Sequence, residues 1–243
     1  MKIFLFAIFS LLFWLSPTPN SGRSENKNLK DKYNYSEDMF EKNVLDIYTK
    51  CNLKDELEFT VFNRAMIGYN SISLTNKKVI TIIDFSKPST EKRLFIIDVE
   101  NRKLLYQTLV AHGKNSGVNI ASQFSNRSGS LKSSLGFFRT AETYNGKHGY
   151  SLRLDGMEKG INDNARKRAI VIHGAKYVND EFINKYNRLG RSWGCPAISD
   201  QLSKEIIELI KDGSCLYIYA NNIDYKENSF DSKQSNLLLS GAN

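Results

Sequence analysis

Short runs of β-branched and aromatic residues restrict the fold of this chain more than any other feature. Three such runs follow one another at residues 78–85, 93–98 and 103–111. Turn-forming or charged segments separate them, at residues 86–89 and 100–102. Apolar runs of this length between turn signals are typical of strands joined by short connections. We therefore predict an antiparallel meander over residues 78–111.

The rest of the chain continues this alternation of short elements. Further strands are predicted at residues 135–140, 150–154, 169–173 and 215–219. The spacing of apolar residues predicts helices at residues 36–51, 180–186 and 200–211. The segment 115–134 is rich in Ser, Gly and Asn and is predicted to be a loop. Loops of this length in compact domains are often functional. The sequence thus predicts a mainly β domain with a few short helices.

The N-terminus has the pattern of a secretory signal peptide. Lys2 precedes an apolar segment at residues 3–15, which is too short for a bilayer span of roughly 20 residues. A buried or interfacial helix is the alternative interpretation of this segment. We expect a signal peptide at 1–22, a flexible lead-in at 23–35, one domain at 36–220 and a polar C-terminal tail at 221–243. The expected protein is exported, periplasmic or cell-wall associated, with no stable membrane anchor after cleavage.

The chain is basic throughout rather than in one block. Its formal net charge is +8, and without Lys2 it has 33 basic and 26 acidic residues, a net charge of +7. This balance favours contact with anionic polymers or surfaces. The basic residues are scattered, without the basic stripe that marks nucleic-acid-binding proteins. We therefore expect no nucleic-acid partner.

Three cysteines divide into two kinds by their surroundings. An odd number in an exported protein leaves at least one thiol without an intramolecular partner. Cys195 lies among Gly, Trp and Pro in a loop, whereas Cys51 and Cys215 lie in apolar segments. Cys51 and Cys215 are either two buried thiols or one disulfide. Cys195 is the candidate reactive thiol.

A histidine and this cysteine together suggest nucleophilic chemistry. His173 ends an apolar run, and a backbone carbonyl beside Gly174 is placed to accept its Nδ1 proton. Gly194 allows a sharp turn before Cys195 and directs backbone N–H groups toward the thiol, where they can hold an oxyanion. A nearby imidazolium is expected to lower the pKa of the thiol and keep it as a thiolate.

A zinc site is the alternative use of these residues. His112, His148 and His173 each precede a glycine, and together with Cys195 they could supply the four ligands of a tetrahedral site. No pair has the close spacing of zinc motifs, and no His-Glu-x-x-His is present. We expect no metal and no cofactor, and either a loop role or a substrate-cleft role for His112 and His148.

The segments around these residues resemble a known family. His173-Gly174 followed by Ser192-Trp193-Gly194-Cys195 is similar to the signature of the YkuD-like L,D-transpeptidases, within the branch of murein L,D-transpeptidase catalytic domain proteins. The resemblance covers roughly residues 55–220, with further matching segments at 110–113, 133–137, 146–154, 172–178 and 190–197. Trp193 stands where the wider family has His, and Pro196-Ala197 where it has an aliphatic residue followed by Arg or Asn.

The resemblance implies an antiparallel β-sandwich with a few short helices, and peptidoglycan stem peptides as partners. Cys195 would attack a tetrapeptide stem and expel D-alanine, His173 would move the proton, and Gly194 would supply an oxyanion donor. Another stem, a lipoprotein lysine, a D-amino acid or water would accept the acyl group. A cross-link hydrolase or carboxypeptidase with the same site, or a non-catalytic cell-wall-binding module, are the alternatives. The candidate substrate-binding residues are Arg191, Ser192, Trp193, Gly174, Arg188 and His148, and Arg191 is expected to replace the basic residue missing after the cysteine.

Overall fold

The computed structural model describes residues 38–222 and Tyr225. The chain divides into two compact units, Met1–Lys42 and Asn43–Asn243. Three predicted segments lie outside the described residues: the signal peptide at 1–22, the lead-in at 23–35 and nearly all of the tail at 221–243. Residues 38–50 are helical, inside the predicted helix at 36–51. None of the helices in the described ranges has the length and apolar character that a membrane span requires.

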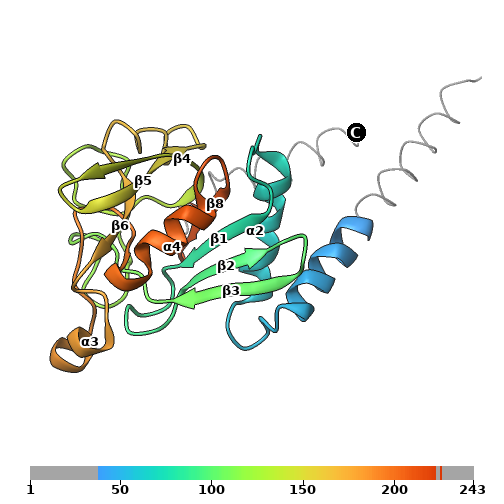
Figure 1. The fold of residues 1–243 in the computed structure, drawn as a ribbon, viewed down its shortest axis with the longest axis horizontal. Helices are drawn as coiled ribbons and strands as arrows, with labels where there is room; N and C mark the ends of the chain where they lie inside the picture. The colour runs from blue at the N-terminus through green and yellow to red at the C-terminus, as the bar shows by residue number, and fades with distance from the viewer. Residues whose placement is uncertain (1–37, 223–224, 226–243) are drawn as a thin grey trace, which may run out of the picture. The chain divides into compact units, whose positions relative to one another are not determined.

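The described residues of the second unit form eight strands and three further helices (Figure 1). The helices are α2 (Phe59–Ser71), α3 (Asp180–Tyr186) and α4 (Asp200–Ile210). The strands are β1 (Val79–Asp84), β2 (Leu94–Asp98), β3 (Lys103–Thr108), β4 (Gly136–Gly146), β5 (Gly149–Gly156), β6 (Val171–Ala175), β7 (Ala197–Ser199) and β8 (Cys215–Tyr219). Each strand and helix that the sequence predicted is present, with ends shifted by a few residues in several cases.

All eight strands belong to one sheet, in the order β3-β2-β1-β8-β4-β5-β6-β7. The predicted meander is confirmed, because β2 pairs antiparallel with both β1 and β3. The predicted antiparallel sandwich is wrong, because the sheet is single and mixed. β8 runs parallel to β1, and β7 runs parallel to β6. Consecutive parallel strands need a crossover connection, and the segment that carries α3 supplies it between β6 and β7. β1 and β8 are separated in sequence by all the other strands of the sheet.

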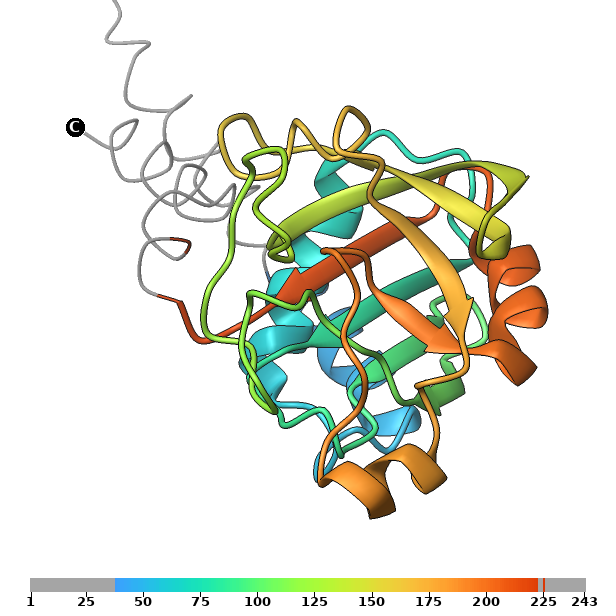
Figure 2. The same ribbon diagram turned by 90° about the vertical axis from the view of Figure 1, so that its left-hand side faces the viewer.

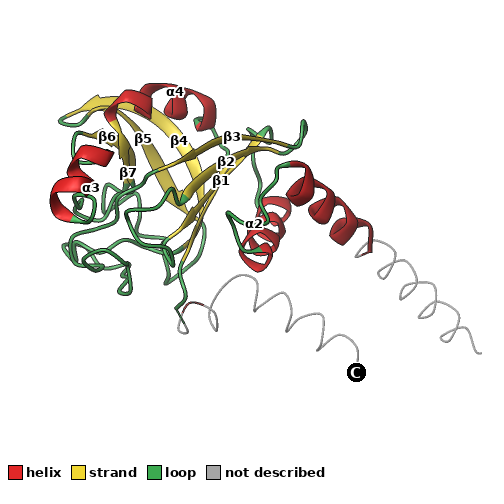
Figure 3. Cartoon of the chain, turned by 90° about the horizontal axis from the view of Figure 1, so that it is seen from below, coloured by secondary structure: helices red, strands yellow, loops and turns green. Residues whose placement is uncertain are grey.

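The centre of the sheet is covered on both faces. Every residue of β1 is buried, and both α2 and α4 contact this strand. Figure 3 shows the two helices on opposite sides of the sheet. Figure 2 shows β8 lying between β1 and β4, where it joins the meander to the strands that carry the candidate site. The stacked rings of Phe137 and Tyr217, with centroids 4.3 Å apart, pack at this junction.

Two elements were not predicted from the sequence. Helix α2 contains Gly68, which lowers helix propensity by about 1 kcal/mol relative to Ala. A Cβ at Gly68 would lie 2.0 Å from Cε1 of Phe137, so this glycine allows the helix to approach the sheet closely. Strand β7 has three residues, which is too short to display an alternating pattern.

The three cysteines are free thiols. Cys51 and Cys215 are buried, which agrees with the first of their two predicted interpretations. Burial raises the pKa of Cys51 to about 11 and the pKa of Cys215 to about 12. Both thiols are therefore protonated near neutral pH, and their place in the core makes them chemically inert.

Candidate active site

The register of three strands brings His173 and Cys195 together. His173 in β6 is aligned with Ser151 of β5 on one side and with Ala197 of β7 on the other. Ala197 lies two residues after Cys195, so the β6–β7 pairing places the cysteine loop beside His173. The β5 pairing places the tip of the β4–β5 hairpin, residues 147–148, at the same spot.

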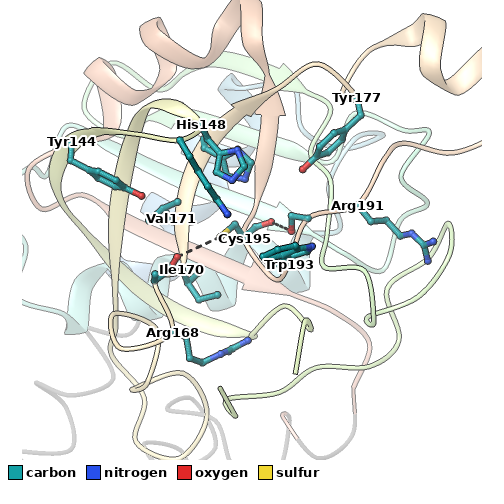
Figure 4. Close-up of a pocket in the computed structure, with 13 residues that line it drawn as sticks. Tyr144, His148, Arg168, Ile170, Val171, Tyr177, Arg191, Trp193 and Cys195 are labelled. Carbon is teal, nitrogen blue, oxygen red and sulfur yellow. Dashed lines mark hydrogen bonds between the residues drawn. The ribbon is translucent and has the colours of Figure 1, made fainter. Parts of the chain in front are cut away.

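These segments enclose a cavity of about 430 Å³ (Figure 4). Both candidate catalytic side chains line it. Four of the predicted substrate-binding residues, His148, Arg191, Ser192 and Trp193, also line it. The remaining lining residues are Tyr144, Lys147, Arg168, Ala169, Ile170, Val171 and Tyr177.

A tight turn presents the Cys195 thiol to this cavity. The Ser192 hydroxyl donates to the Cys195 carbonyl at 2.6 Å and accepts the Gly194 N–H at 3.0 Å. Gly194 has φ of +129°, a conformation that side chains disfavour. Because its N–H is bonded to Ser192, Gly194 makes the turn here and has no N–H free for an oxyanion.

The loop predicted at 115–134 contacts this turn through hydrogen bonds of Ser133. Ser133 donates from its hydroxyl to the Gly194 carbonyl at 3.1 Å and accepts the Gly113 N–H at 3.0 Å. A Cβ at Gly113 would lie 2.9 Å from the Cα of Gly194 and 2.7 Å from the Leu131 carbonyl oxygen. Backbone therefore packs against backbone directly beneath the cysteine loop.

The Cys195 thiol is protonated in this environment. Burial raises its pKa, and the Val171 backbone N–H and the positive charges of Arg168 and Lys147 offset part of that rise. The S–H donates toward the Ala169 carbonyl oxygen at 3.6 Å. The expectation of a lowered pKa for Cys195 is therefore wrong, because burial outweighs the nearby charges.

His173 has the tautomer of a proton acceptor. Its Nδ1 donates to the Gly174 carbonyl oxygen at 2.8 Å, as the sequence predicted, which leaves Nε2 as the basic nitrogen. The ring is 2% exposed, and burial lowers its pKa against the opposing effect of the Gly174 carbonyl. Gly174 does not line the cavity, and a Cβ there would lie 2.6 Å from the Asp200 carboxylate at the start of α4.

Two contacts cross the cavity mouth from the β4–β5 hairpin. The His148 ring stacks on the His173 ring, with centroids 4.4 Å apart. The Lys147 ammonium lies 4.7 Å from the centre of the Trp193 ring. Trp193 is 70% exposed, so this ring is available to a ligand rather than part of the core.

The two arginines predicted to anchor substrate differ in position. Arg191 lines the cavity, but its Nη1 donates to the Lys114 and Gly117 carbonyl oxygens at 3.2 and 3.0 Å. Figure 4 shows its side chain pointing away from Cys195. Arg188 donates to the Leu189 carbonyl oxygen and does not line the cavity.

Sequence reasoning missed Arg168, although a basic run at residues 166–168 precedes β6. Its guanidinium donates to the carbonyl oxygens of Ser125 and Lys132 at 2.6 and 2.7 Å. It also contacts the hydroxyls of Ser134 and Ser130. Arg168 therefore holds the segment 125–134 through hydrogen bonds. Its positive charge also lowers the pKa of Cys195.

Two tyrosine hydroxyls add neutral polar groups to the cavity. Tyr144 and Tyr177 line the cavity, and Figure 4 shows both hydroxyls directed inward. Burial raises the pKa of Tyr177 to about 12, so it is a neutral donor near pH 7. Tyr150 lies outside the cavity and donates to Glu208.

His112 lies apart from the other two histidines. It is fully buried, accepts at Nδ1 from Arg93 at 2.9 Å and donates from Nε2 to the Gly117 carbonyl oxygen at 3.3 Å. Burial and the Arg93 charge lower its pKa to about 4. Among the described residues, no three His, Cys, Asp or Glu side chains gather in a way that would hold a metal ion.

Solved structures that are similar to this chain at low identity include two L,D-transpeptidases and a cell-shape determining protein. The chain is 11% identical to the enzyme from Mycobacterium smegmatis, with 59% of each chain covered and a TM-score of 0.37. It is 14% identical to the helical cell shape determining protein Pgp2 of Campylobacter jejuni, covering 62% of this chain and 49% of that one, with a TM-score of 0.40. It is 14% identical to the enzyme from Stackebrandtia nassauensis, covering 73% and 76%, with a TM-score of 0.35. The chain thus spans less than two thirds of the first two proteins.

The family assignment comes from the sequence over the whole described domain. No curated protein matches the chain. The family model of the L,D-transpeptidase catalytic domain matches residues 53–219, from the segment before α2 to the end of β8. This range includes every strand of the sheet and the cavity that joins Cys195 to His173. The chain therefore belongs to the L,D-transpeptidase catalytic domain family.

Proposed function

We propose that this protein is a peptidoglycan L,D-transpeptidase in which Cys195 is the nucleophile and His173 is the general base. The observation that carries the proposal is that both side chains line one cavity, with the basic nitrogen of His173 left free by the Gly174 carbonyl. A protonated thiol beside a neutral imidazole suits proton transfer at the moment of attack. This arrangement needs no thiolate in the resting enzyme.

Acylation follows from these positions. The Cys195 sulfur attacks the carbonyl of the third residue of a tetrapeptide stem as its proton passes to Nε2 of His173. Collapse of the tetrahedral intermediate breaks the peptide bond, and His173 returns the proton to the leaving D-alanine amine. The products are a Cys195 thioester and free D-alanine. The Cys195 and Val171 N–H groups, which face the sulfur, are the proposed oxyanion donors in place of Gly194.

Deacylation reverses the same proton path. The amine of an acceptor stem gives its proton to Nε2 of His173 while it attacks the thioester carbonyl. A new amide forms, and the thiol regains its proton as the carbon–sulfur bond breaks. A lipoprotein lysine or a D-amino acid presents the same amine chemistry, and water would give a carboxypeptidase or hydrolase instead.

We also propose that the protein acts outside the cytoplasmic membrane, at the cell wall. The apolar segment at residues 3–15 supports a signal peptide, and peptidoglycan lies in that compartment. N-terminal sequencing of the secreted protein should give a first residue between Pro17 and Asn26. Recovery of the uncleaved chain from the cytoplasm alone would overturn this proposal.

The function is tested on purified sacculi and on tetrapeptide stems. We expect the full-length mature protein to release D-alanine and form cross-linked dimers, detected by mass spectrometry of the muropeptides. Cys195→Ala and His173→Ala should each reduce product formation at least 100-fold. Equal product from the Cys195→Ala variant would refute the nucleophile. D-Alanine release without dimers would assign water as the acceptor.

A carbapenem separates an enzyme from a wall-binding module that has retained the fold. A reactive Cys195 should form a covalent adduct, visible by intact mass, that is absent in Cys195→Ala. A wall-binding module would bind sacculi in both forms and form no adduct in either.

A further inference from the structure

The cavity is cationic on every side that carries charge. Lys147, Arg168 and Arg191 line it, and no Asp or Glu is among its lining residues. Because no carboxylate in the lining compensates these charges, a ligand that brings its own negative charge is favoured. The three side chains differ in how many N–H donors they have free for such a ligand.

Two of the three are already bound to the protein. The Arg168 guanidinium donates to four oxygens of the loop beneath the cysteine turn. Arg191 donates to two carbonyl oxygens of the 114–117 segment and points away from Cys195. Reorienting either side chain would leave these oxygens without their donor, which is unfavourable.

Lys147 is in a different position. Across the described part of the chain, its ammonium makes no hydrogen bond or ion pair, and its one polar contact is the face of the Trp193 ring. An ammonium has three N–H donors, and stacking on a ring leaves them open to the cavity. The hairpin tip also places Lys147 near the reacting groups, since its charge shifts the pKa of both Cys195 and His173.

We propose that Lys147, held over Trp193, binds a carboxylate of the acyl donor next to the bond that is broken. This inference rests on the proposed function, because it takes a stem peptide as the donor. Two carboxylates of a diaminopimelate tetrapeptide lie near that bond, on the terminal D-alanine and on the diaminopimelate side chain. Lys147 thereby replaces Arg191 as the substrate anchor.

Trp193 has a defined part in this site. Its exposed ring fixes where the flexible lysine chain places the ammonium, which lowers the entropy that binding has to overcome. The ring also excludes water from one side of the ion pair, which strengthens the attraction. Trp193→Ala is therefore expected to weaken binding of the carboxylate as well.

Binding is measured in the Cys195→Ala protein, so that no turnover is needed. Isothermal titration compares three probes: the free tetrapeptide, the same peptide ending in D-alaninamide, and the peptide amidated at the diaminopimelate carboxylate. Each probe is titrated into the parent, Lys147→Met, Lys147→Arg and Lys204→Met. Lys204 is an exposed lysine of α4 outside the cavity and serves as the matched control.

We expect amidation of one of the two carboxylates to weaken binding to the parent about fivefold at low salt, the upper range for an exposed ion pair. Lys147→Met should bind the free peptide about fivefold more weakly than the parent does. It should also bind the free peptide and the affected amidated probe with equal affinity. Lys147→Arg should retain most of the preference for the free peptide, and Lys204→Met should retain all of it. The probe that loses affinity identifies the carboxylate.

Two results would overturn the proposal. One is a Lys147→Met protein that still discriminates between the free and amidated probes. The other is a parent protein that binds all three probes equally. Turnover by the protein with Cys195 intact is measured separately, so absence of transpeptidation would refute the proposed function and leave the binding result as a test of Lys147 alone.

Discussion

The imidazole rings of His148 and His173 stack with centroids 4.4 Å apart and an angle of 23° between their planes. Two rings this close cannot both carry a positive charge without mutual repulsion. Burial is the main reason that the pKa of His173 is lowered, and the charges of His148 and Lys147 lower it further. The hairpin tip thus helps to keep the proposed general base neutral.

The first prediction concerns this pair. A lowered pKa of His173 keeps the base active at pH values where an ordinary histidine, with a pKa of about 6.5, is already protonated. In His148→Gln the repulsion is lost, so the pKa of His173 should rise and the acid limb of kcat/KM should move to higher pH. A pH–rate profile and NMR titration of His173 measure this. An acid limb that stays in place would show that the stack has no electrostatic role.

The second prediction concerns the thiol. Since burial raises the pKa of Cys195, alkylation by iodoacetamide should have its midpoint above the ordinary thiol value of about 8.5. The charge of Arg168 opposes this rise, so Arg168→Met should move the midpoint still higher, whereas Arg168→Lys should move it less. Lys167→Met, an exposed neighbour, is the control. A wild-type midpoint below 8 would restore the thiolate that the sequence first suggested.

Arg168→Met should also loosen the loop beneath the active-site turn. Four hydrogen bonds from one guanidinium to the segment 125–134 disappear together. We expect a loss of about 2 to 4 kcal/mol in the free energy of unfolding, taking roughly 0.5 to 1 kcal/mol for each bond. Urea denaturation measures it, and a loss below 0.5 kcal/mol would mean that the loop is held by other contacts.

The fourth prediction tests the backbone contact under Cys195. Gly113→Ala places a Cβ where the Leu131 carbonyl oxygen and the Gly194 Cα already lie within 3 Å. Because backbone rather than a flexible side chain must move, we expect a cost of about 1 to 3 kcal/mol and a lower alkylation rate of Cys195. Lys114→Ala, which changes an exposed neighbour, should alter neither. Wild-type alkylation by Gly113→Ala would show that the cysteine loop is supported elsewhere.

The fifth prediction separates the three thiols. Cys195→Ala should change the free energy of unfolding by less than about 0.5 kcal/mol, because a half-buried loop thiol contributes little packing. Cys51→Ala and Cys215→Ala should each cost about 1 kcal/mol, since they remove an atom from the core. Both core variants should keep wild-type turnover. Loss of turnover in a stably folded Cys215→Ala protein would give that thiol a role beyond packing.

Local sequence patterns were enough to predict seven of the eight described strands, most of the helices and the Cys195–His173 pair as the candidate catalytic residues. Residues 79–84 are rich in β-branched side chains and residues 215–219 are apolar and aromatic, and both runs form strands in the fold. The His173-Gly174 and Ser192–Cys195 segments carry their chemistry in their residue types. The tautomer of His173 was also predictable, because its partner is the carbonyl of the next residue.

How these strands, helices and motifs come together depends on contacts between residues that are distant in the sequence. Periodicity gives no sheet order, so the parallel pairing of β8 with β1, which makes the sheet mixed, had no local signal. Lys147 is 48 residues from Cys195 in sequence and lies near the thiol because of the β5–β6 register. Arg168 is 27 residues away and lies near the thiol because of the turn before β6. Arg191, adjacent to the motif in sequence, is instead bound to the 114–117 carbonyl oxygens. The direction of the Cys195 pKa shift depends on desolvation, which exists only once the surrounding segments have packed together.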